Sequence, residues 1–590
     1  MKFRDFANYL ERLEATTKRL EITSILADLI KNMDQEEADK GVYLSLGYLK
    51  AIYENPKFNI AEKMVIRILE LAFETDKQAI ENHYAKLGDL GDVAFEMSKT
   101  KKSQSPGLKN VYESLVEIAN IEGPGSQELK VKKSAELLKK MDPLSAKYSV
   151  RIILGTIRLG FTELTIIDAL AELLGDKKLS EQIENRYSIH PDIGLITKII
   201  KKEGIKGIEK IKIETGVPIL AQRCQRLSDP KEVIEKMGRI WAEFKFDGTR
   251  VQLHMNRKIK PKSKDIEQSD LFGRENSKIL IKTFTRNLEE TTHQYPDIIE
   301  AANKLIMADS VILDGEAIGL DKKTGEFLPF QETIQRKRKY GVAEMVKDIP
   351  LKYFVFDILY LNGKELIQLP LSERKALLKK VIRPDEAIVV DTYVETDSAE
   401  KLAEYFEEAK DKNLEGLIVK KPGSIYQAGA RSFSWIKMKK ADAKLLEDTV
   451  DCVVLGYYHG KGVRAQYGIG GFLVGVYDDK NQKFKTITKI GTGLKEDDWT
   501  YLKKEADKVK IKEKPNNVEV NKILEPDIWT QPKIVVEVGA DEISKSPTHT
   551  AGYALRFPRL IKFRTDKKPT DATSIKEIIS LHNMQKRGYY

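Results

Sequence analysis

Apolar residues recur at helical spacing in the first third of the chain. In residues 150–157 they fall at positions i, i+3, i+4 and i+7, which places them on one face of a helix. A second run follows at residues 167–174, and Gly175 behind it is the residue type that most often ends a helix. This periodicity predicts an all-α domain over residues 1–215.

Strands and helices alternate in the next part of the chain, residues 216–445. Short apolar runs of strand length are separated by longer segments with helical periodicity, the pattern of an α/β or α+β domain. The predicted strands lie at residues 311–313, 353–361 and 416–419, and the predicted helices at residues 288–307 and 399–412.

Short strands separated by Gly-rich turns dominate residues 446–590. Many short strands of similar spacing are typical of a small closed sheet, here a β-barrel of the OB type. The predicted strands lie at residues 452–457, 472–477, 484–490 and 534–538.

Charge and cysteine content narrow the class of protein. Lys and Arg total 100 against 90 Asp and Glu, a net charge of +10, so a polyanion would have to bind local basic patches. The two cysteines, Cys224 and Cys452, are far apart, which argues against a zinc ribbon or a disulfide scaffold and fits a reducing cytoplasm. No apolar run approaches membrane-spanning length, so we expect a cytoplasmic protein without membrane contact.

The stretch of residues 243–250, Glu-Phe-Lys-Phe-Asp-Gly-Thr-Arg, is the most informative in the chain. Behind it, Val251, Leu253 and Met255 alternate with polar residues, which predicts a half-buried strand and places Lys245 at a strand end beside an Asp-Gly turn. An amine held on rigid strands near cationic neighbours loses its proton more readily and can act as a nucleophile. The alternative is an ordinary exposed hairpin with a solvated lysine.

Other segments supply the remaining parts of a nucleotidyl-transfer site. Glu316 and Glu415 lie beside strands and can hold Mg²⁺ through oxygen, and Phe356 offers an aromatic face to a purine. Three lysines on strands can neutralise phosphate charge in a transition state. These lysines are Lys420, Lys437 and Lys439. Each residue alone is better explained as a turn acid, a solvated lysine or a core aromatic, and only their order and spacing together indicate a site.

Seven motifs follow one another along the chain. They are Lys-x-Asp-Gly-x-Arg, Thr-Arg-Asn, Asp-Gly-Glu, Phe-Asp-Ile-Leu-Tyr-Leu-Asn-Gly, Glu-Gly-Leu-Ile-Val-Lys, Trp-Ile-Lys-Met-Lys and Arg-Phe-Pro-Arg. In this order they resemble the motifs of covalent nucleotidyltransferases, and within these the ATP-dependent DNA ligases of the archaeal and eukaryotic replicative type. Residues 86–94 and 146–160 are similar to that family's N-terminal DNA-binding domain, so the resemblance extends over nearly the whole chain.

The resemblance implies a DNA ligase that seals nicks in three steps. Lys245 attacks the α-phosphate of ATP and carries AMP, AMP passes to the 5′-phosphate at a nick, and the 3′-hydroxyl attacks that phosphate and expels AMP. ATP and Mg²⁺ are the implied cofactors, nicked double-stranded DNA is the implied partner, and replication, repair and recombination are the implied settings. A helical DNA-binding domain, a nucleotidyltransferase (adenylation) domain and an OB-fold domain with a C-terminal tail would span residues 1–215, 216–445 and 446–590.

The same resemblance assigns roles to the site residues. Glu243 would bind the adenine amino group, Phe356 would stack on adenine, and Glu316 and Glu415 would serve the metal and the ribose. Contacts to the ribose or the nick phosphate would come from Arg250 and Arg286. The phosphates would be held by Lys420, Lys437 and Lys439, with Arg431 nearby.

A late basic cluster would act in the first step only. It would swing in with the last domain, through a hinge at residues 440–442, and orient pyrophosphate for departure. The cluster consists of Arg556, Arg559, Arg564, Asp566 and Lys567.

Two other classes of protein share parts of this pattern. An RNA-capping guanylyltransferase or an RNA ligase has the lysine motif, and a catalytically silent DNA-binding scaffold would keep the domains without the reaction. The long helical domain and the Trp-Ile-Lys-Met-Lys motif favour DNA ligation.

The sliding clamp is a second candidate partner. Archaeal relatives often carry a clamp-binding box with paired aromatics in the loop that here spans residues 102–107, where this chain has none. The tail at residues 585–590 resembles a shortened box, and a frayed terminus is the alternative. We expect the chain to act as a monomer.

Overall fold

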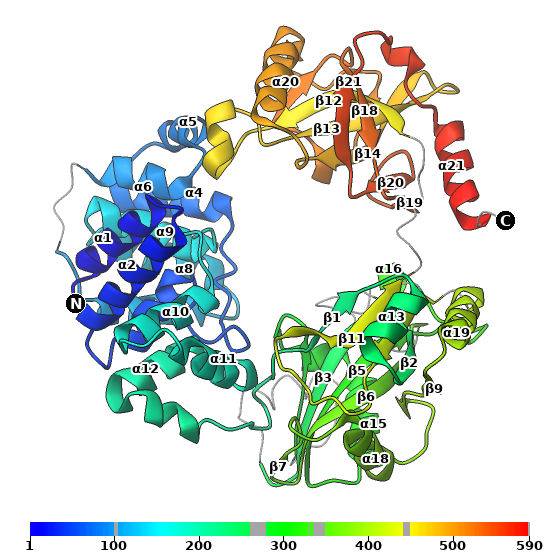
Figure 1. Ribbon diagram of the computed structural model, residues 1–590. Coiled ribbons are helices and arrows are strands. Elements are labelled where there is room, and N and C mark those ends of the chain that lie inside the picture. Colours follow the sequence, from blue (N-terminus) through cyan, green and yellow to red (C-terminus); the bar gives the residue numbers. More distant parts are fainter. Residues whose placement is uncertain are drawn as a thin grey trace. The chain divides into compact units, whose positions relative to one another are not determined.

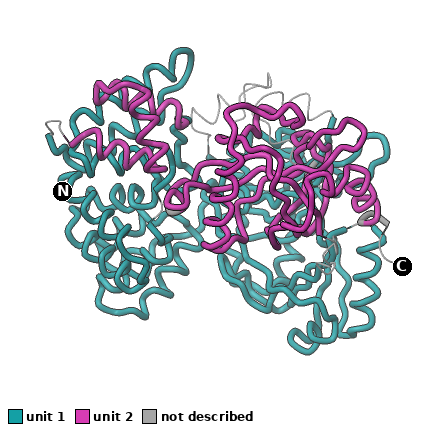
Figure 2. The backbone as a smooth tube through the Cα atoms, turned by 90° about the horizontal axis from the view of Figure 1, so that it is seen from above, with its two compact units in different colours: residues 1–60, 103–440 teal, residues 61–102, 441–590 magenta. Residues whose placement is uncertain are grey.

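The computed structural model in Figure 1 describes residues 1–99, 104–157, 159–259, 279–328, 330–333, 348–412, 414–439 and 449–587. Contacts divide the chain into two compact units, which Figure 2 distinguishes by colour. Unit 1 comprises residues 1–60 and 103–440, and unit 2 comprises residues 61–102 and 441–590. Among the described residues, no helix is long and apolar enough to cross a membrane.

The N-terminal part of unit 1 is helical, as its apolar periodicity predicts. Helix α9 (Pro143–Leu154) begins where the Asp142 side chain accepts a hydrogen bond from the Ser145 amide, and it ends at Gly155 with a φ of +64°. Helix α10 (Glu163–Leu173) packs on α2 (Arg19–Asn32), and Gly175 follows it with a φ of +80°, as predicted. The predicted first run is too long by three residues, because Gly155 ends the helix before Ile157. The other helices here are α1 (Phe3–Glu14), α3 (Ala38–Ser45), α7 (Leu108–Ala119), α8 (Ser126–Leu138), α11 (Leu179–Ile189) and α12 (Ile193–Glu203), with η1 (Ile205–Lys210).

Two sheets form the rest of unit 1. The first has the order β1-β11-β10-β2-β9, and α13 (Pro230–Met237) and α19 (Ala399–Asp411) supply side chains to its core. The second has the order β4-β3-β5-β6-β7 with β8 beside β6, and it packs on α15 (Pro296–Leu305) and α18 (Leu371–Val381). The strands are β1 (Arg223–Arg226), β2 (Ile240–Lys245), β3 (Thr249–Asn256), β4 (Leu280–Thr285), β5 (Ser310–Gly319), β6 (Leu351–Leu361), β7 (Lys364–Glu365), β8 (Ile388–Val390), β9 (Val394–Thr396), β10 (Gly416–Lys420) and β11 (Arg431–Lys439), and the short helices are η3 (Thr292–Gln294) and α16 (Phe330–Thr333).

Strand β3 differs from the half-buried strand that its alternation predicts. Val251, Leu253 and Met255 are buried in the core of the second sheet, as expected. Gln252 and His254 on the opposite face are buried too, because the segment before β1 covers them. The Gln252 amide accepts from the Ile219 N–H at 2.8 Å and donates to the Ile219 carbonyl at 3.0 Å, and His254 Nδ1 accepts from the Gly216 amide at 3.1 Å. The polar residues on this strand are therefore hydrogen-bonded interior groups.

The predicted helix at residues 288–307 is correct only in its second half. Helix α15 starts at Pro296, the residue type that suits a first helical turn. The preceding residues form a tight connection after β4 instead, in which the Thr291 amide donates to the Thr283 carbonyl at 2.8 Å. The helix predicted at residues 399–412 is confirmed as α19.

Unit 2 combines three helices of the N-terminal part with the β-rich C-terminal part. Its main sheet has the order β15-β17-β12-β13-β14-β16, and β18 joins β12 to β21. All four strands predicted here are present, as β12, β13, β14 and β18. The strands are β12 (Val450–Tyr458), β13 (Gly471–Asp478), β14 (Lys483–Ile490), β15 (Lys510–Ile511), β16 (Val518–Glu519), β17 (Ile528–Thr530), β18 (Val535–Gly539), β19 (Glu542–Lys545), β20 (Tyr553–Arg556) and β21 (Arg559–Phe563). The helices are α4 (Glu62–Phe73), α5 (Lys77–Leu87), α6 (Leu90–Ser98), α20 (Glu496–Lys508) and α21 (Ile575–Arg587), with η5 (Gly462–Tyr467), η6 (Lys522–Leu524) and η7 (Pro569–Asp571).

Candidate active site

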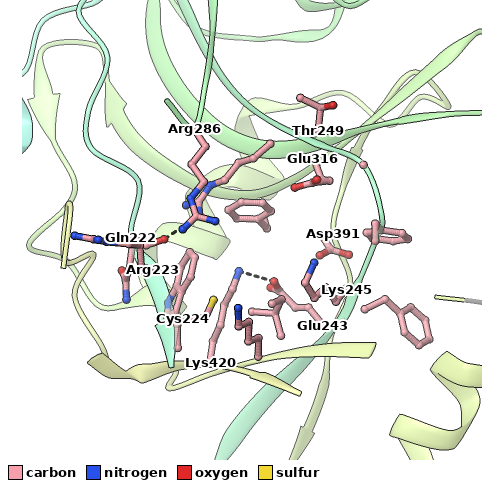
Figure 3. Close-up of a pocket in the computed structure, with 18 of the residues that line it drawn as sticks. Gln222, Arg223, Cys224, Glu243, Lys245, Thr249, Arg286, Glu316, Asp391 and Lys420 are labelled. Atoms are coloured by element: carbon pink, nitrogen blue, oxygen red, sulfur yellow. Dashed lines mark hydrogen bonds and ion pairs between the residues drawn. The ribbon is translucent and has the colours of Figure 1, made fainter. Parts of the chain in front are cut away.

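A cavity of about 670 Å³ in unit 1 is lined by residues from both sheets. Figure 3 shows its side chains, with Lys245 and Glu243 from β2, Lys420 from β10 and Glu316 from β5 among those labelled. Ten residues singled out in the sequence, although spread over almost 200 positions, meet in this one cavity. They are Glu243, Lys245, Arg250, Arg286, Glu316, Phe356, Lys420, Arg431, Lys437 and Lys439.

Lys245 forms an ion pair with Glu415, and the same carboxylate also pairs with Lys439. The nearest charge to the amine is therefore a carboxylate, whereas the sequence led us to expect cationic neighbours. A carboxylate in this place balances the charge of Lys245, and it is also positioned to accept a proton from Nζ. These ion pairs lower the pKa of Glu415 against the opposing effect of burial.

Two glycines fix the backbone on either side of this ion pair. Gly416, directly after Glu415, has a φ of +141°, and a Cβ there would lie 2.1 Å from the Met438 carbonyl oxygen. Gly248 lies in the predicted Asp-Gly turn, and a Cβ there would lie 2.5 Å from the Ala317 carbonyl oxygen of β5. Close approach to the neighbouring strand thus requires glycine at position 248.

Arg250 is held firmly from behind. Its Nε and Nη2 donate to the two oxygens of Asp314 at 3.0 and 2.6 Å, and its Nη1 donates to the Gln222 carbonyl at 2.8 Å. The Tyr426 hydroxyl donates to the same Asp314 carboxylate at 2.8 Å. A bidentate pair of this kind fixes the plane of the guanidinium. Arg250 therefore presents a fixed positive charge to the cavity.

An aromatic wall closes one end of the cavity. Phe356 and Trp435 meet edge to face with their ring centroids 5.9 Å apart, and Lys420 Nζ lies 4.4 and 4.3 Å from the two centroids. Lys420 Nζ is also 2.5 Å from Glu243 Oε2. The charge of Lys420 thus faces Glu243 and the rings, so the structure gives its predicted phosphate contact no direct support.

The Trp-Ile-Lys-Met-Lys segment lies on β11 with the alternation that its sequence predicts. Ile436 and Met438 are buried in the core of the first sheet. Trp435, Lys437 and Lys439 line the cavity on the other face. Burial and the neighbouring Lys439 lower the pKa of Lys437, as expected for clustered ammonium groups.

Glu316 is the carboxylate most perturbed by its surroundings. Burial is the main cause that raises its pKa to about 7 from an ordinary value of 4.5, while Lys245 and Arg250 oppose the change. Glu316 lines the cavity, and Glu415 pairs with two lysines that line it. Two carboxylates fit Mg²⁺, which commonly binds one or two protein carboxylates and completes its shell with phosphate and water. No group of three or more acidic, His or Cys ligands occurs in the described part of the chain.

Glu316→Gln should stabilise the fold in a pH-dependent manner. Folding raises the pKa of Glu316, so the folded state is favoured while this side chain is protonated. This contribution to the free energy of unfolding is fully present below pH 4.5 and is lost as the pH rises through 7. Glutamine avoids this loss, so we expect a gain of about 1–2 kcal/mol in the free energy of unfolding at pH 8 and little at pH 5. Denaturant unfolding at both pH values measures the difference, and an equal effect at both would contradict the assignment.

The late basic cluster lies in unit 2, and its role at a cavity of unit 1 stays a prediction. Four of its five residues take part in ion pairs within unit 2. Arg564 pairs with Asp566 at 2.7 Å and with Asp451 at 3.2 Å, and Arg559 pairs with Asp541 at 2.7 Å. Lys567 also binds Asp451, and Arg556 lies over the exposed Phe557 ring. The predicted hinge at residues 440–442 lies outside the described residues.

The sequence interpretation missed several residues of the cavity. Asp391, Gln222 and Cys224 line it, and Lys375 pairs with Glu243 from behind. An acid directly after the strand at residues 388–390 was a usable signal for Asp391. No sequence signal marked Lys375, because it lies on an ordinary amphipathic helix.

Comparisons with known proteins decide the family. The family model described as DNA ligase N terminus matches residues 2–171, that of the ATP dependent DNA ligase domain matches residues 274–439, and that of the ATP dependent DNA ligase C terminal region matches residues 465–567. A probable DNA ligase of Dictyoglomus turgidum is 42% identical over 596 residues, with 100% of this chain and 98% of the relative covered. The chain belongs to the ATP-dependent DNA ligases.

Further relatives match this chain over nearly its whole length. This ligase is 38% identical to DNA ligase 2 of Korarchaeum cryptofilum and 36% identical to a DNA ligase of Sulfolobus acidocaldarius, each with 99% of this chain and 98% of the relative covered. The solved structure titled Pmar-Lig_Pre. covers 95% of this chain and 99% of its own, with a TM-score of 0.54 and 17% identity, which shows a similar fold. The predicted family is thus confirmed, and this ligase joins nicked DNA with ATP and a divalent metal, typically Mg²⁺.

Proposed function

We propose that this ligase seals nicks through a phosphoramidate between AMP and Lys245. The observation that carries the proposal is the ion pair of Lys245 with Glu415 in the wall of the cavity where the other predicted nucleotide-binding residues meet. The Nζ lone pair attacks the α-phosphorus, the bond to the bridging oxygen breaks, and pyrophosphate departs. Glu415 is positioned to take the proton that Nζ loses.

AMP then passes to DNA at the same cavity. An oxygen of the nick 5′-phosphate attacks the phosphorus, and the bond to Nζ breaks while Nζ regains a proton. The 3′-hydroxyl finally attacks the 5′-phosphate, forms the new phosphodiester bond and releases AMP. Charge on the transferring phosphate is met by fixed cations, which lower the barrier only if they are in place beforehand. We assign this part to Arg250, Arg286, Arg431, Lys437 and Lys439.

We propose Glu316 and Glu415 as the protein ligands of Mg²⁺. Bound there, the metal would neutralise phosphate oxygens and would draw the charge of Glu415 away from Lys245. The ribose would contact Glu316, and the purine would stack on Phe356 and approach Glu243. Because Lys420 Nζ already lies 2.5 Å from Glu243, we assign Lys420 to the base rather than to the phosphates.

The domain plan is also a proposal. We divide the chain into a DNA-binding domain at residues 1–215, an adenylation domain at 216–445 and an OB-fold domain at 446–590. The helical and OB-fold domains would bind backbone phosphates without reading bases, and Arg556, Arg559, Arg564, Asp566 and Lys567 would orient pyrophosphate after closure. Because its substrate is DNA, we expect the ligase to work inside the cell, as a monomer. Clamp binding by residues 585–590 stays a prediction, since those side chains lie outside the described part.

Incubation with labelled nucleotides tests the proposed reaction. We expect an acid-labile AMP adduct from ATP, and joining of a nicked duplex once DNA is added with Mg²⁺. The rival enzymes predict other products, a GMP adduct for a guanylyltransferase and joining of nicked RNA in preference to DNA for an RNA ligase. Either product as the main one would contradict the proposal.

A further inference from the structure

Four charged side chains form a buried cluster at the inner end of the cavity. They come from β2, α18, β10 and the connection after β8, and their exposed fractions are 5% or less. The members are Glu243, Lys375, Asp391 and Lys420. Burial of charges to this extent costs folding free energy unless each charge is paired.

The two lysines are both directed at Glu243. Lys375 Nζ lies 2.8 Å from Oε1 and Lys420 Nζ lies 2.5 Å from Oε2, so each carboxylate oxygen has its own ammonium group. Asp391 is the second acid of the cluster and its exposed fraction is 5%. Its amide donates to the Val355 carbonyl at 2.8 Å, which fixes the residue beside β6, next to Phe356.

Glu243, Asp391 and Lys420 all line the cavity, whereas Lys375 lies behind Glu243. Burial, and then repulsion by Glu243, raises the pKa of Asp391 to about 7 despite the nearby lysines, and the Tyr405 hydroxyl is a further polar group in its surroundings. Near neutral pH Asp391 therefore still carries its proton in part of the molecules and can donate a hydrogen bond. The cavity wall then offers an acceptor on Glu243 and a donor on Asp391.

We propose that Asp391 is a specificity-determining residue that, together with Glu243, selects adenine over guanine. This inference rests on the proposed function, in which the base lies between Phe356 and Glu243. Adenine presents an amino donor at C6 beside an acceptor at N1, which complements a Glu243 acceptor and an Asp391 donor. Guanine presents an acceptor at C6 and a donor at N1, so both contacts are reversed and two buried polar groups lose their partners.

Asp391→Asn and Asp391→Ala test this role. Asparagine has both a donor and an acceptor and can pair with either base, so the ratio of adenylylation to guanylylation rates should fall by at least about tenfold. Alanine can pair with neither, so the KM for ATP should rise by about tenfold or more while the rate at saturation changes little. The matched control is Glu386→Gln, an exposed acid shortly before β8, which should keep the wild-type ratio.

The readout is the initial rate of adduct formation with ATP, GTP and ITP. Sealing of a nick that already carries AMP needs no free nucleotide, so any sealing of this substrate by the two Asp391 variants shows that they are folded, whatever its rate. Wild-type ratios in both variants, with sealing intact, would overturn the role of Asp391 alone. Absence of any adduct on the wild-type protein would overturn the proposed function, and the inference with it.

Discussion

Lys245→Ala should reduce nick joining with ATP by at least about 10⁴-fold, because the nucleophile of the first step is lost. Two other lysines of the described cavity are already engaged, since Lys439 pairs with Glu415 and Lys420 pairs with Glu243. Lys437 has a lowered pKa, so it is the neighbouring amine to monitor for an adduct in the variant.

The control separates loss of the nucleophile from loss of the fold. DNA that already carries AMP at the nick bypasses the first step, so Lys245→Ala should still join it and should bind nicked DNA as the wild type does. Lys401→Ala, at an exposed position of α19, is the matched lysine variant and should join nicks normally. Persistent adduct formation by Lys245→Ala would show that another residue is the nucleophile.

Arg374→Met should destabilise unit 1 by about 3–5 kcal/mol, because it leaves the Asp357 carboxylate buried without its partner. Arg374 and Asp357 are both 0% exposed, and they pair through two hydrogen bonds of 2.7 and 2.9 Å. Asp357 follows Phe356 on β6, so this ion pair helps to fix the position of the strand on which Phe356 lies. We also expect weaker ATP binding in the variant at temperatures where it remains folded.

Calorimetric unfolding of the variant measures the loss. The double variant Asp357→Leu with Arg374→Met removes both charges and should recover much of the stability, since a buried pair can be replaced by apolar residues at little cost. A single variant with the wild-type unfolding transition would show that the pair contributes little. In that case the position of Phe356 would have to depend on the hydrogen bonds of the sheet.

The residues that meet in the cavity could be predicted because their motifs carry strand periodicity. Alternation on residues 435–439 gives the shared face of Lys437 and Lys439, and the order of the motifs gives the family. The sequence also predicts the strand end that carries Lys245. These features are local, so one segment at a time is sufficient to recognise them.

Pairs between distant segments could not be predicted in this way. Lys375 and Glu243 are 132 residues apart, and Lys375 follows the pattern of a solvated lysine on the helix Leu371–Val381. Burial of both faces of β3 depends on a segment that has no regular structure around Gly216. Likewise, only the fold reveals that Glu415, rather than a cation, is the nearest charge to Lys245.

Mapping the covalent adduct tests the central claim most directly. The wild-type ligase is incubated with ATP and Mg²⁺, digested, and the peptides are analysed by mass spectrometry under conditions that preserve a phosphoramidate. We expect the mass of one AMP on the peptide that contains Lys245 and on no other lysine of the cavity. An adduct on Lys420, Lys437 or Lys439, or no adduct in a preparation that joins nicks, would contradict the account.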